Sequence, residues 1–325
     1  MRLFVPAVKL LILLAGLSAF SMPVLAEDYP SRTIKLVVPF PPGGSSDYMG
    51  RVVANGLKDE LGETAIIENK GGAGTLLGTE AVARADPDGY TLLATATPFA
   101  INATLVKTVN FDTVKSFDPV IFTGSIPLVL LVNEKSPWRS LKDLVEAAKA
   151  KPGVYTYGSS GNGGSPHLAT SMIEAATGIK LVHIPYKGRA PAVADLVAGQ
   201  TDLVIDTVFL GAPHVKSGRL RALVQLGAQR SILLPDVPTM QELGYKDFSA
   251  VSWFGIFAPA GTPRPILQKL NVAINRTLAK PEIAETLKAQ GFFIDGGPLD
   301  GAMPRLKREI EIWGKAVRDS GAVAQ

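Results

Sequence analysis

Three glycine-rich segments of this sequence are of a type that can hold an anion. They are 37–47 (VVPFPPGGSSD), 66–78 (IIENKGGAGTLLG) and 155–168 (YTYGSSGNGGSPHL). Each runs from an apolar, strand-like stretch through glycines into a helix-like stretch. The first N–H groups of a helix lack backbone acceptors and lie at the positive end of its dipole, and glycine allows a ligand to approach the backbone closely. The spacing therefore predicts three anion-binding turns, which suit a nucleotide phosphate, an acyl group on a serine or a free carboxylate.

The nucleotide alternatives fit the residues poorly. Segment 158–165 (GSSGNGGS) follows the P-loop pattern, except that Gly164 stands where the phosphate-binding lysine belongs. Gly72, Gly74 and Gly78 depart by one residue from the dinucleotide-binding pattern, and they follow the second strand-like run instead of the first. Neither departure favours a nucleotide.

A catalytic serine remains possible at this stage. The nucleophile elbow G-x-S-x-G is not formed, because Asn162 stands where its last glycine belongs, and the chain contains no S-x-x-K. His167 is close in sequence to Ser165, but a helix start disfavours an imidazolium. Since the members of a triad can be far apart in the chain, an exported serine hydrolase stays the alternative hypothesis.

The segments that position these turns alternate between strand-like and helix-like patterns. Several apolar runs are continuous in Val, Ile and Leu, as expected of strands buried on both faces. This βαβ rhythm predicts an α/β protein with mostly parallel sheets. The predicted strands are 34–39, 64–68, 90–96, 154–158, 181–185, 203–206 and 220–226, and the predicted helices are 47–61, 76–84, 141–150, 166–177 and 192–198.

Polar residues and prolines mark several helix starts. Ser140 with Asp143 resembles a capping box, and Ser165 before Pro166 resembles an N-cap before a first-turn proline, a device that Thr262-Pro263 repeats. We also expect Thr75 to cap its helix. Near the end of the chain, the spacing of Ile310, Trp313 and Val317 predicts the core-facing stripe of a terminal helix.

Two long extended runs, 120–132 and 249–259, interrupt the alternation. We interpret them as two strands that cross between two domains. The first domain is then discontinuous, 27–125 plus 252–325, and 126–251 forms the inserted second domain. A ligand cleft between the domains would open and close about the crossing strands.

Residues 1–26 have the features of a cleaved signal peptide, namely basic Arg2 and Lys9, an apolar run at 10–20 and small residues before the expected cleavage point. Removing them leaves 299 of 325 residues, enough for two domains. The chain has no cysteine, so it can form neither disulfides nor a lipoprotein anchor. We therefore expect a soluble protein of a bacterial periplasm.

Charge and composition narrow the range of partners. The net charge is +4 for the whole chain and no basic tract stands out, which argues against nucleic acid and anionic lipid as partners. With three histidines and no cysteine, a His/Cys zinc site is not expected, and we predict neither a metal nor a cofactor.

Seven segments, in order over nearly the whole mature chain, resemble the Bug family of periplasmic solute receptors, which are similar to those of tripartite tricarboxylate transporters. The segments are YPSRTIKLVVPFPPGGSSD, GGAGTLLGTEAVARADPDGYTLL, YGSSGNGGSPHLA, IPYKGRAPAVADLVAGQTDLVID, PHVKSGRLRAL, LPDVPTMQELGY and WFGIFAPAGTP. The resemblance implies a type II periplasmic-binding-protein fold, in which two αβ domains joined by two crossing strands close on a small carboxylate. It also implies a monomeric, non-enzymatic receptor that serves the membrane subunits of a transporter or a sensor protein.

In this family, backbone N–H groups and waters of two glycine loops hold the carboxylate. Carried over to this sequence, the first loop supplies Pro42, Gly43, Gly44 and Ser45, and the facing loop supplies Ser159, Gly161, Gly163 and Ser165. Two acidic residues are further candidates. We interpret Asp47 mainly as a helix cap, and Asp206, at the end of LVID, could face the ligand or cap the next helix. The remaining candidates are Thr95, Thr97, and Gly74 and Thr75 of the middle loop.

The middle loop also departs from the family pattern. Lys70-Gly71 stands where Arg-Pro is frequent, Thr75 where glycine is frequent, and Gly50 replaces a common alanine on the first helix. Because the middle loop can line the pocket, the ligand cannot be taken from any one relative. A dicarboxylate, a tricarboxylate, an acidic amino acid and an aromatic acid all remain candidates.

Overall fold

The structure is a computed structural model, and it describes residues 29–323 of the chain. The predicted signal peptide, residues 1–26, lies outside this described part. Within it, no helix is both long enough and apolar enough to cross a membrane.

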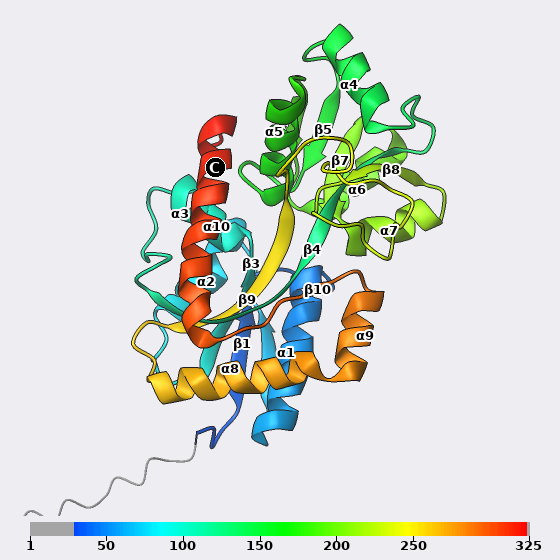
Figure 1. Ribbon diagram of the computed structural model, residues 1–325. Coiled ribbons are helices and arrows are strands. Elements are labelled where there is room, and N and C mark those ends of the chain that lie inside the picture. Colours follow the sequence, from blue (N-terminus) through cyan, green and yellow to red (C-terminus); the bar gives the residue numbers. More distant parts are fainter. Residues whose placement is uncertain (1–28, 324–325) are drawn as a thin grey trace, which may run out of the picture.

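Two αβ domains lie one above the other (Figure 1). The first begins with three strand–helix units: β1 (Ile34–Val38) and α1 (Ser45–Leu61), β2 (Ala65–Asn69), η1 (Ala73–Thr75) and α2 (Leu76–Ala83), and β3 (Thr91–Ala96) and α3 (Pro98–Leu105). The second follows as β4 (Phe117–Asn133), α4 (Leu141–Ala150), β5 (Thr156–Ser159), α5 (Ser165–Thr177), β6 (Val182–Pro185), α6 (Arg189–Ala198), β7 (Leu203–Thr207), α7 (Val208–Lys216) and β8 (Leu220–Gln225). The chain returns through β9 (Val251–Pro259), α8 (Arg264–Ala279), α9 (Pro281–Ala289), β10 (Phe293–Ile294) and α10 (Leu299–Ser320).

The two domains share one sheet, with strand order β2-β1-β3-β9-β4-β7-β5-β6. The long strand β4 joins them: its first part, 117–127, pairs with β9, and 128–133 pairs with β7 and β8. The chain crosses back near Ala250, whose N–H donates to the Leu226 carbonyl oxygen of the second domain (2.7 Å), one residue before β9 begins. The two extended runs are therefore confirmed as crossing segments.

The hydrophobic core is also continuous between the domains. One buried cluster includes Leu36 and Val53 of the first domain with Leu131 and Val193 of the second. Because β4 and β7 are buried on both faces along most of their length, apolar residues predominate in both, as in 128–132 (LVLLV) and 203–205 (LVI).

Helix α10 spans the junction of the domains (Figure 1). Its early residue Leu306 packs in a first-domain cluster, whereas Trp313 and Val317 belong to a cluster with Leu144 and Leu168 of the second domain. The helix contacts both α3 and α5. The apolar stripe predicted for the terminal helix is confirmed, and it packs against both domains.

The predicted helix starts have mixed outcomes. The capping box at α4 is confirmed, because the Asp143 N–H donates to Ser140 Oγ (3.2 Å) and the Ser140 N–H donates to Asp143 Oδ2 (3.0 Å). The N-cap prediction for Ser165 is wrong, since Gly164 occupies that position and Ser165 is the first helical residue. The prediction for Thr262 is also wrong, because its hydroxyl donates to the Pro259 carbonyl oxygen (2.7 Å) and Pro263 is the N-cap.

Candidate ligand-binding site

The first glycine loop connects β1 to α1 and is held by a buried carboxylate. Gly43 has a φ of +82°, in the left-handed region that favours glycine, and its N–H donates to Asp47 Oδ2 (3.0 Å). Asp47 is 3% exposed and also accepts from Arg51 (3.0 and 3.1 Å) and from Asn69 Nδ2 (2.9 Å). Asp47 lies in the first turn of α1 and fixes the loop before it, but it does not cap the helix as predicted, because the N-cap is Gly44 and no side chain caps it.

The ionised state of Asp47 is favoured by these contacts. Burial alone raises the pKa of this carboxyl, but the hydrogen bonds from Arg51, the Gly43 N–H and Asn69 outweigh burial and hold the pKa below its usual value. The Asp47 carboxylate thus receives its hydrogen bonds from groups of the protein itself. Asp47 therefore shapes the loop, and Pro42 and Gly43 remain exposed beside it, with Ser45 buried at the first position of α1.

The middle glycine loop packs directly against the first. The Lys70 N–H donates to the Val38 carbonyl oxygen (2.9 Å), and Asn69 Nδ2 donates to the Phe40 carbonyl oxygen (3.1 Å). A Cβ on Gly78 would lie 2.6 Å from the Lys70 carbonyl oxygen and 2.8 Å from Pro39 Cβ, so only glycine permits this approach. The structure thus brings the first two loops together at the ends of neighbouring strands.

Thr75 of the middle loop does not act as the predicted cap. It stands at the N-cap position of α2, but its φ is +84° and its side chain caps no N–H of the helix. Instead, Asn102 of α3 donates to Thr75 Oγ1 (3.2 Å) and to the Gly74 carbonyl oxygen (2.9 Å). A left-handed backbone at a β-branched residue costs on the order of 1–3 kcal/mol, so Asn102 stabilises a strained turn.

Thr95, inside β3, and Thr97, directly after it, differ in availability. The Thr97 hydroxyl accepts from the Trp253 N–H (3.1 Å) and donates to the Val251 carbonyl oxygen (3.4 Å), which links β3 to the crossing strand β9. Thr95 is 2% exposed, and its hydroxyl has no hydrogen-bond partner within residues 29–323. Thr97 is thus engaged by the protein itself.

The third glycine loop connects β5 to α5 and is held by two histidines. Gly161 (φ +124°) donates its N–H to Ser159 Oγ (3.1 Å), which lies 2.6 Å from His183 Nε2 of β6. Gly163 (φ +68°) donates its N–H to His167 Nδ1 (2.9 Å). Ser159 and Ser165 are each 1% exposed. The hydroxyl of Ser159 therefore holds the turn from inside.

The third loop reaches the first domain through α3. A Cβ on Gly163 would lie 2.2 Å from Leu105 Cδ2, so this loop is in contact with the helix whose Asn102 holds the middle loop. On another side of the junction, the rings of Tyr48 in α1 and Phe209 in α7 are 5.5 Å apart. The glycine loops of both domains thus lie at the junction between them.

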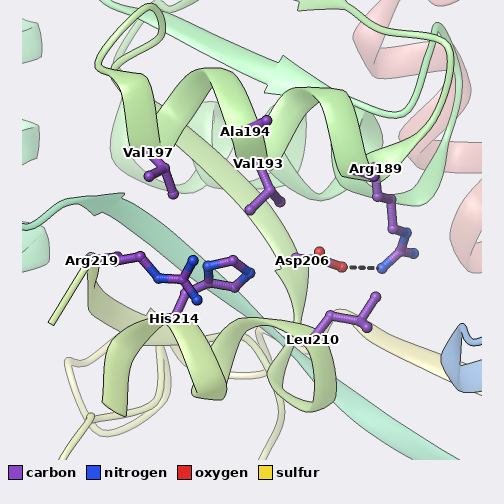
Figure 2. A pocket seen from close by; sticks show the side chains of 9 residues that line it. Arg189, Val193, Ala194, Val197, Asp206, Leu210, His214 and Arg219 are labelled. Atoms are coloured by element: carbon purple, nitrogen blue, oxygen red, sulfur yellow. Dashed lines mark hydrogen bonds and ion pairs between the residues drawn. The ribbon is translucent and has the colours of Figure 1, made fainter. Parts of the chain in front are cut away.

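Asp206 lies near the end of β7, the strand that pairs with β5, and lines a separate cavity. This cavity of about 510 Å³ lies between α6 and α7 and contains none of the other predicted site residues (Figure 2). Its carboxylate is paired with Arg189 at the start of α6 and accepts the Thr207 N–H (2.7 Å). Apolar side chains and two basic residues complete the walls: Ala190, Val193, Ala194, Val197, Leu210, His214 and Arg219.

Several residues that organise the site are absent from the sequence-based prediction. They are Arg51, Asn69, Asn102, His167, His183 and Arg189. Among residues 29–323, no group of three or more His, Asp or Glu side chains could hold a metal ion.

Acid is expected to destabilise the folded protein through its histidines. Burial, and secondarily the neighbouring His167, lower the pKa of His183 to about 4, and burial also lowers the pKa values of His167 and His214. The unfolded chain then binds more protons between about pH 6.5 and pH 4, so stability falls as the pH decreases through this window. We expect a loss of about 2 kcal/mol after allowance for partial exposure, measured by urea unfolding at both ends of the window. A constant urea midpoint would contradict neutral, buried histidines.

A shared sheet crossed by two strands, with glycine loops of both domains at their junction, defines a solute-binding protein of the periplasmic-binding-protein type. The model of the tripartite tricarboxylate transporter family receptor matches residues 49–298. The chain belongs to this receptor family.

Individual relatives agree with this assignment. BugT of Bordetella pertussis is 40% identical over 310 residues, which cover 95% of this chain and 94% of BugT. The solved periplasmic binding protein BugD is 34% identical, with a TM-score of 0.81 over 91% of this chain and 100% of that chain. An R. palustris protein solved with adipate is 31% identical, with a TM-score of 0.84 over 91% of this chain and 99% of that chain.

Proposed function

We propose that this receptor captures a small organic carboxylate between the glycine loops of its two domains and closes over it. The first loop contributes Gly44 and the N–H groups that open α1, and the third loop contributes the N–H groups that open α5. Gly43, Gly161 and Gly163, whose own N–H groups are bonded to side chains, give the two loops their shape. The domains that close are 27–125 plus 252–325 and the inserted 126–251. No catalytic residue takes part.

The construction of the two loops carries this proposal. Each follows a parallel strand and precedes a helix, where backbone N–H groups and the helix dipole favour an anion. Each is also fixed by a side chain that accepts a glycine N–H, Asp47 in the first domain and His167 in the second. Rigid N–H groups bind a carboxylate better than mobile ones, because less ordering entropy is lost on binding.

The choice among carboxylates would fall to the other groups near the junction. Thr95, with a buried and unpartnered hydroxyl in the described part of the chain, and the strained turn at Gly74 and Thr75 are candidates. The relative solved with adipate makes a dicarboxylate the first class to test. Asp206 would act indirectly, because Arg189 already occupies its carboxylate.

Our proposal for the cellular role rests on the receptor family and on the predicted signal peptide. We propose export through a signal peptide at residues 1–26, a monomer in the periplasm, and delivery of the ligand to the membrane subunits of a tripartite transporter or to a sensor protein.

Native mass spectrometry of the purified protein, followed by thermal unfolding with a panel of acids, tests the ligand class. The panel contains malate, adipate, citrate, glutamate and nicotinate, and adipamide is the control without carboxylates. At an acid concentration of about 100 times Kd, binding adds about 2.7 kcal/mol to the free energy of unfolding. For a chain of this length, this raises the unfolding temperature by roughly 4 °C. Equal shifts with adipate and adipamide, or no shift with any acid, would contradict carboxylate binding.

One observation favours the alternative of an exported hydrolase, namely the 2.6 Å contact of Ser159 Oγ with His183 Nε2. Against it, burial and His167 lower the pKa of His183 to about 4, which makes this imidazole a weak base at neutral pH. Release of a chemically changed acid or ester, lost in Ser159→Ala, would support the hydrolase and exclude a simple receptor.

A further inference from the structure

Two imidazole rings lie side by side behind the third glycine loop. The ring centroids of His167 in α5 and His183 in β6 are 4.0 Å apart, with an interplanar angle of 15°. The ring of Tyr157 in β5 stacks on His183 at 4.8 Å. Three elements of the second domain thus place their aromatic rings together directly under the turn.

Each imidazole fixes a different glycine of the loop. His167 Nδ1 accepts the Gly163 N–H, so this nitrogen carries no proton of its own. Ser159 Oγ accepts the Gly161 N–H and lies 2.6 Å from His183 Nε2. The Ser159 hydroxyl is also 3.1 Å from the Gly161 carbonyl oxygen, so Ser159 bridges both polar backbone groups of Gly161, and His183 acts on this glycine by fixing the Ser159 hydroxyl.

The loop needs such support because its own sequence does not specify one conformation. Gly161 and Gly163 both have positive φ values, and ordering a residue costs roughly 1–2 kcal/mol of backbone entropy. Without side-chain partners for these two N–H groups, the turn would sample conformations in which the N–H groups that open α5 are not held in place for a ligand.

The charge state of the pair agrees with this role. Two charged rings at this distance would repel each other. Burial and His167 lower the pKa of His183, burial alone lowers that of His167, and no carboxylate of residues 29–323 contributes to either shift. Glu174 of α5 acts on the neighbouring Tyr157. Both rings therefore remain neutral acceptors at the pH at which the receptor works.

We propose that His183 and His167 are positioning residues for ligand capture, with His183 holding Gly161 through Ser159 and His167 holding Gly163 directly. This inference rests on the proposed carboxylate function and names the groups that set the geometry of its second loop. Neither imidazole needs to touch the ligand.

A double-mutant cycle of His183→Phe and Ser159→Ala tests the arrangement. Phenylalanine keeps a ring beside Tyr157 and His167 but removes Nε2, and we expect about 10-fold weaker adipate binding, or weaker binding of whichever panel acid binds best. Ser159→Ala should weaken binding about equally, and the double variant should lose no more than either single one. His183→Gln, which restores an acceptor, should recover part of the affinity, and His214→Phe in α7 is the matched control expected to bind normally.

Amide hydrogen exchange of segment 159–165 without ligand supplies a readout that does not depend on carboxylate binding. Exchange at Gly161 should accelerate about 10-fold in His183→Phe, because the Ser159 hydroxyl that accepts its N–H is no longer held by His183. The affinity of the wild-type protein should also stay constant from about pH 8 to about pH 6, since neutral rings do not titrate there.

The outcomes separate this inference from the proposed function. If the wild-type protein binds no carboxylate but exchange at Gly161 accelerates in His183→Phe, the proposed ligand is wrong and the positioning role stands. If His183→Phe leaves both the exchange and the affinity unchanged, the positioning role is wrong and the proposed ligand stands. Additive losses in the double variant would likewise exclude action through Ser159.

Discussion

Replacing Gly44 by valine is expected to abolish carboxylate binding while the protein remains folded. Gly44 is the N-cap of α1, with extended backbone angles (φ −82°, ψ 170°) that any residue can adopt. A Cβ there meets only the Pro41 carbonyl oxygen, at 3.9 Å. The branched side chain would instead occupy the space in front of the first N–H groups of α1. We expect at least 100-fold weaker binding, about 2.7 kcal/mol, by isothermal calorimetry.

Two variants serve as controls for this result. Gly44→Ser places a favoured N-cap residue with a small side chain at the same position, so stability should be kept or slightly raised and binding should weaken only a few-fold. Gly43→Val should instead destabilise the fold, because φ is +82° there. Normal binding by Gly44→Val would show that the first glycine loop does not hold the ligand.

Asp47→Ala is expected to reduce both stability and affinity. The substitution removes the carboxylate acceptor of the exposed Gly43 N–H and of the half-buried Asn69 Nδ2, which keeps its bond to the Phe40 carbonyl oxygen. A buried donor left unsatisfied costs about 1–3 kcal/mol, and water can reach Gly43, so we expect a loss of about 1–3 kcal/mol in urea unfolding. Because Gly43 is no longer fixed, adipate or the best panel acid should bind more than about 10-fold more weakly.

The matched control for this prediction is Arg51→Ala. The Arg51 side chain is 53% exposed and water can replace its contacts, so its loss should cost no more than about 1 kcal/mol. Asp47→Asn should fall between the two, since one acceptor oxygen remains. An Asp47→Ala protein as stable as the wild type would mean that water replaces the carboxylate and that the loop does not depend on it.

The architecture could be predicted because buried strands have a strong sequence signal. Largely apolar runs locate β4 and β7, and α4 begins where its capping box indicates. Helix α7 is harder to predict because Pro213 lies inside it, and α3 is short and begins at Pro98. Tertiary packing decides such helices, since isolated short helices are marginal in water.

The glycine turns of the site could be predicted locally, but their partners could not. Asn102 supports Gly74 from 28 residues away, and His183 lies within an apolar strand run 24 residues after Ser159. Asp206 lies one residue before the end of β7 instead of ending it as predicted, and pairing with Arg189 holds its carboxylate in another cavity. Ser165 resembles a cap because proline follows it, yet the helix begins one residue earlier than that pattern predicts.

The position of α10 across both domains gives this protein an intrinsic optical probe. The protein has three tryptophans, and two of them, Trp253 on β9 and Trp313 on α10, are buried near the junction of the domains. Both lie near the carboxyl group of Glu309. The third, Trp138, packs on Tyr155 within the second domain. A movement of one domain against the other would change the surroundings of the first two indoles and leave Trp138 as an internal reference, so fluorescence emission can follow ligand capture without an attached dye.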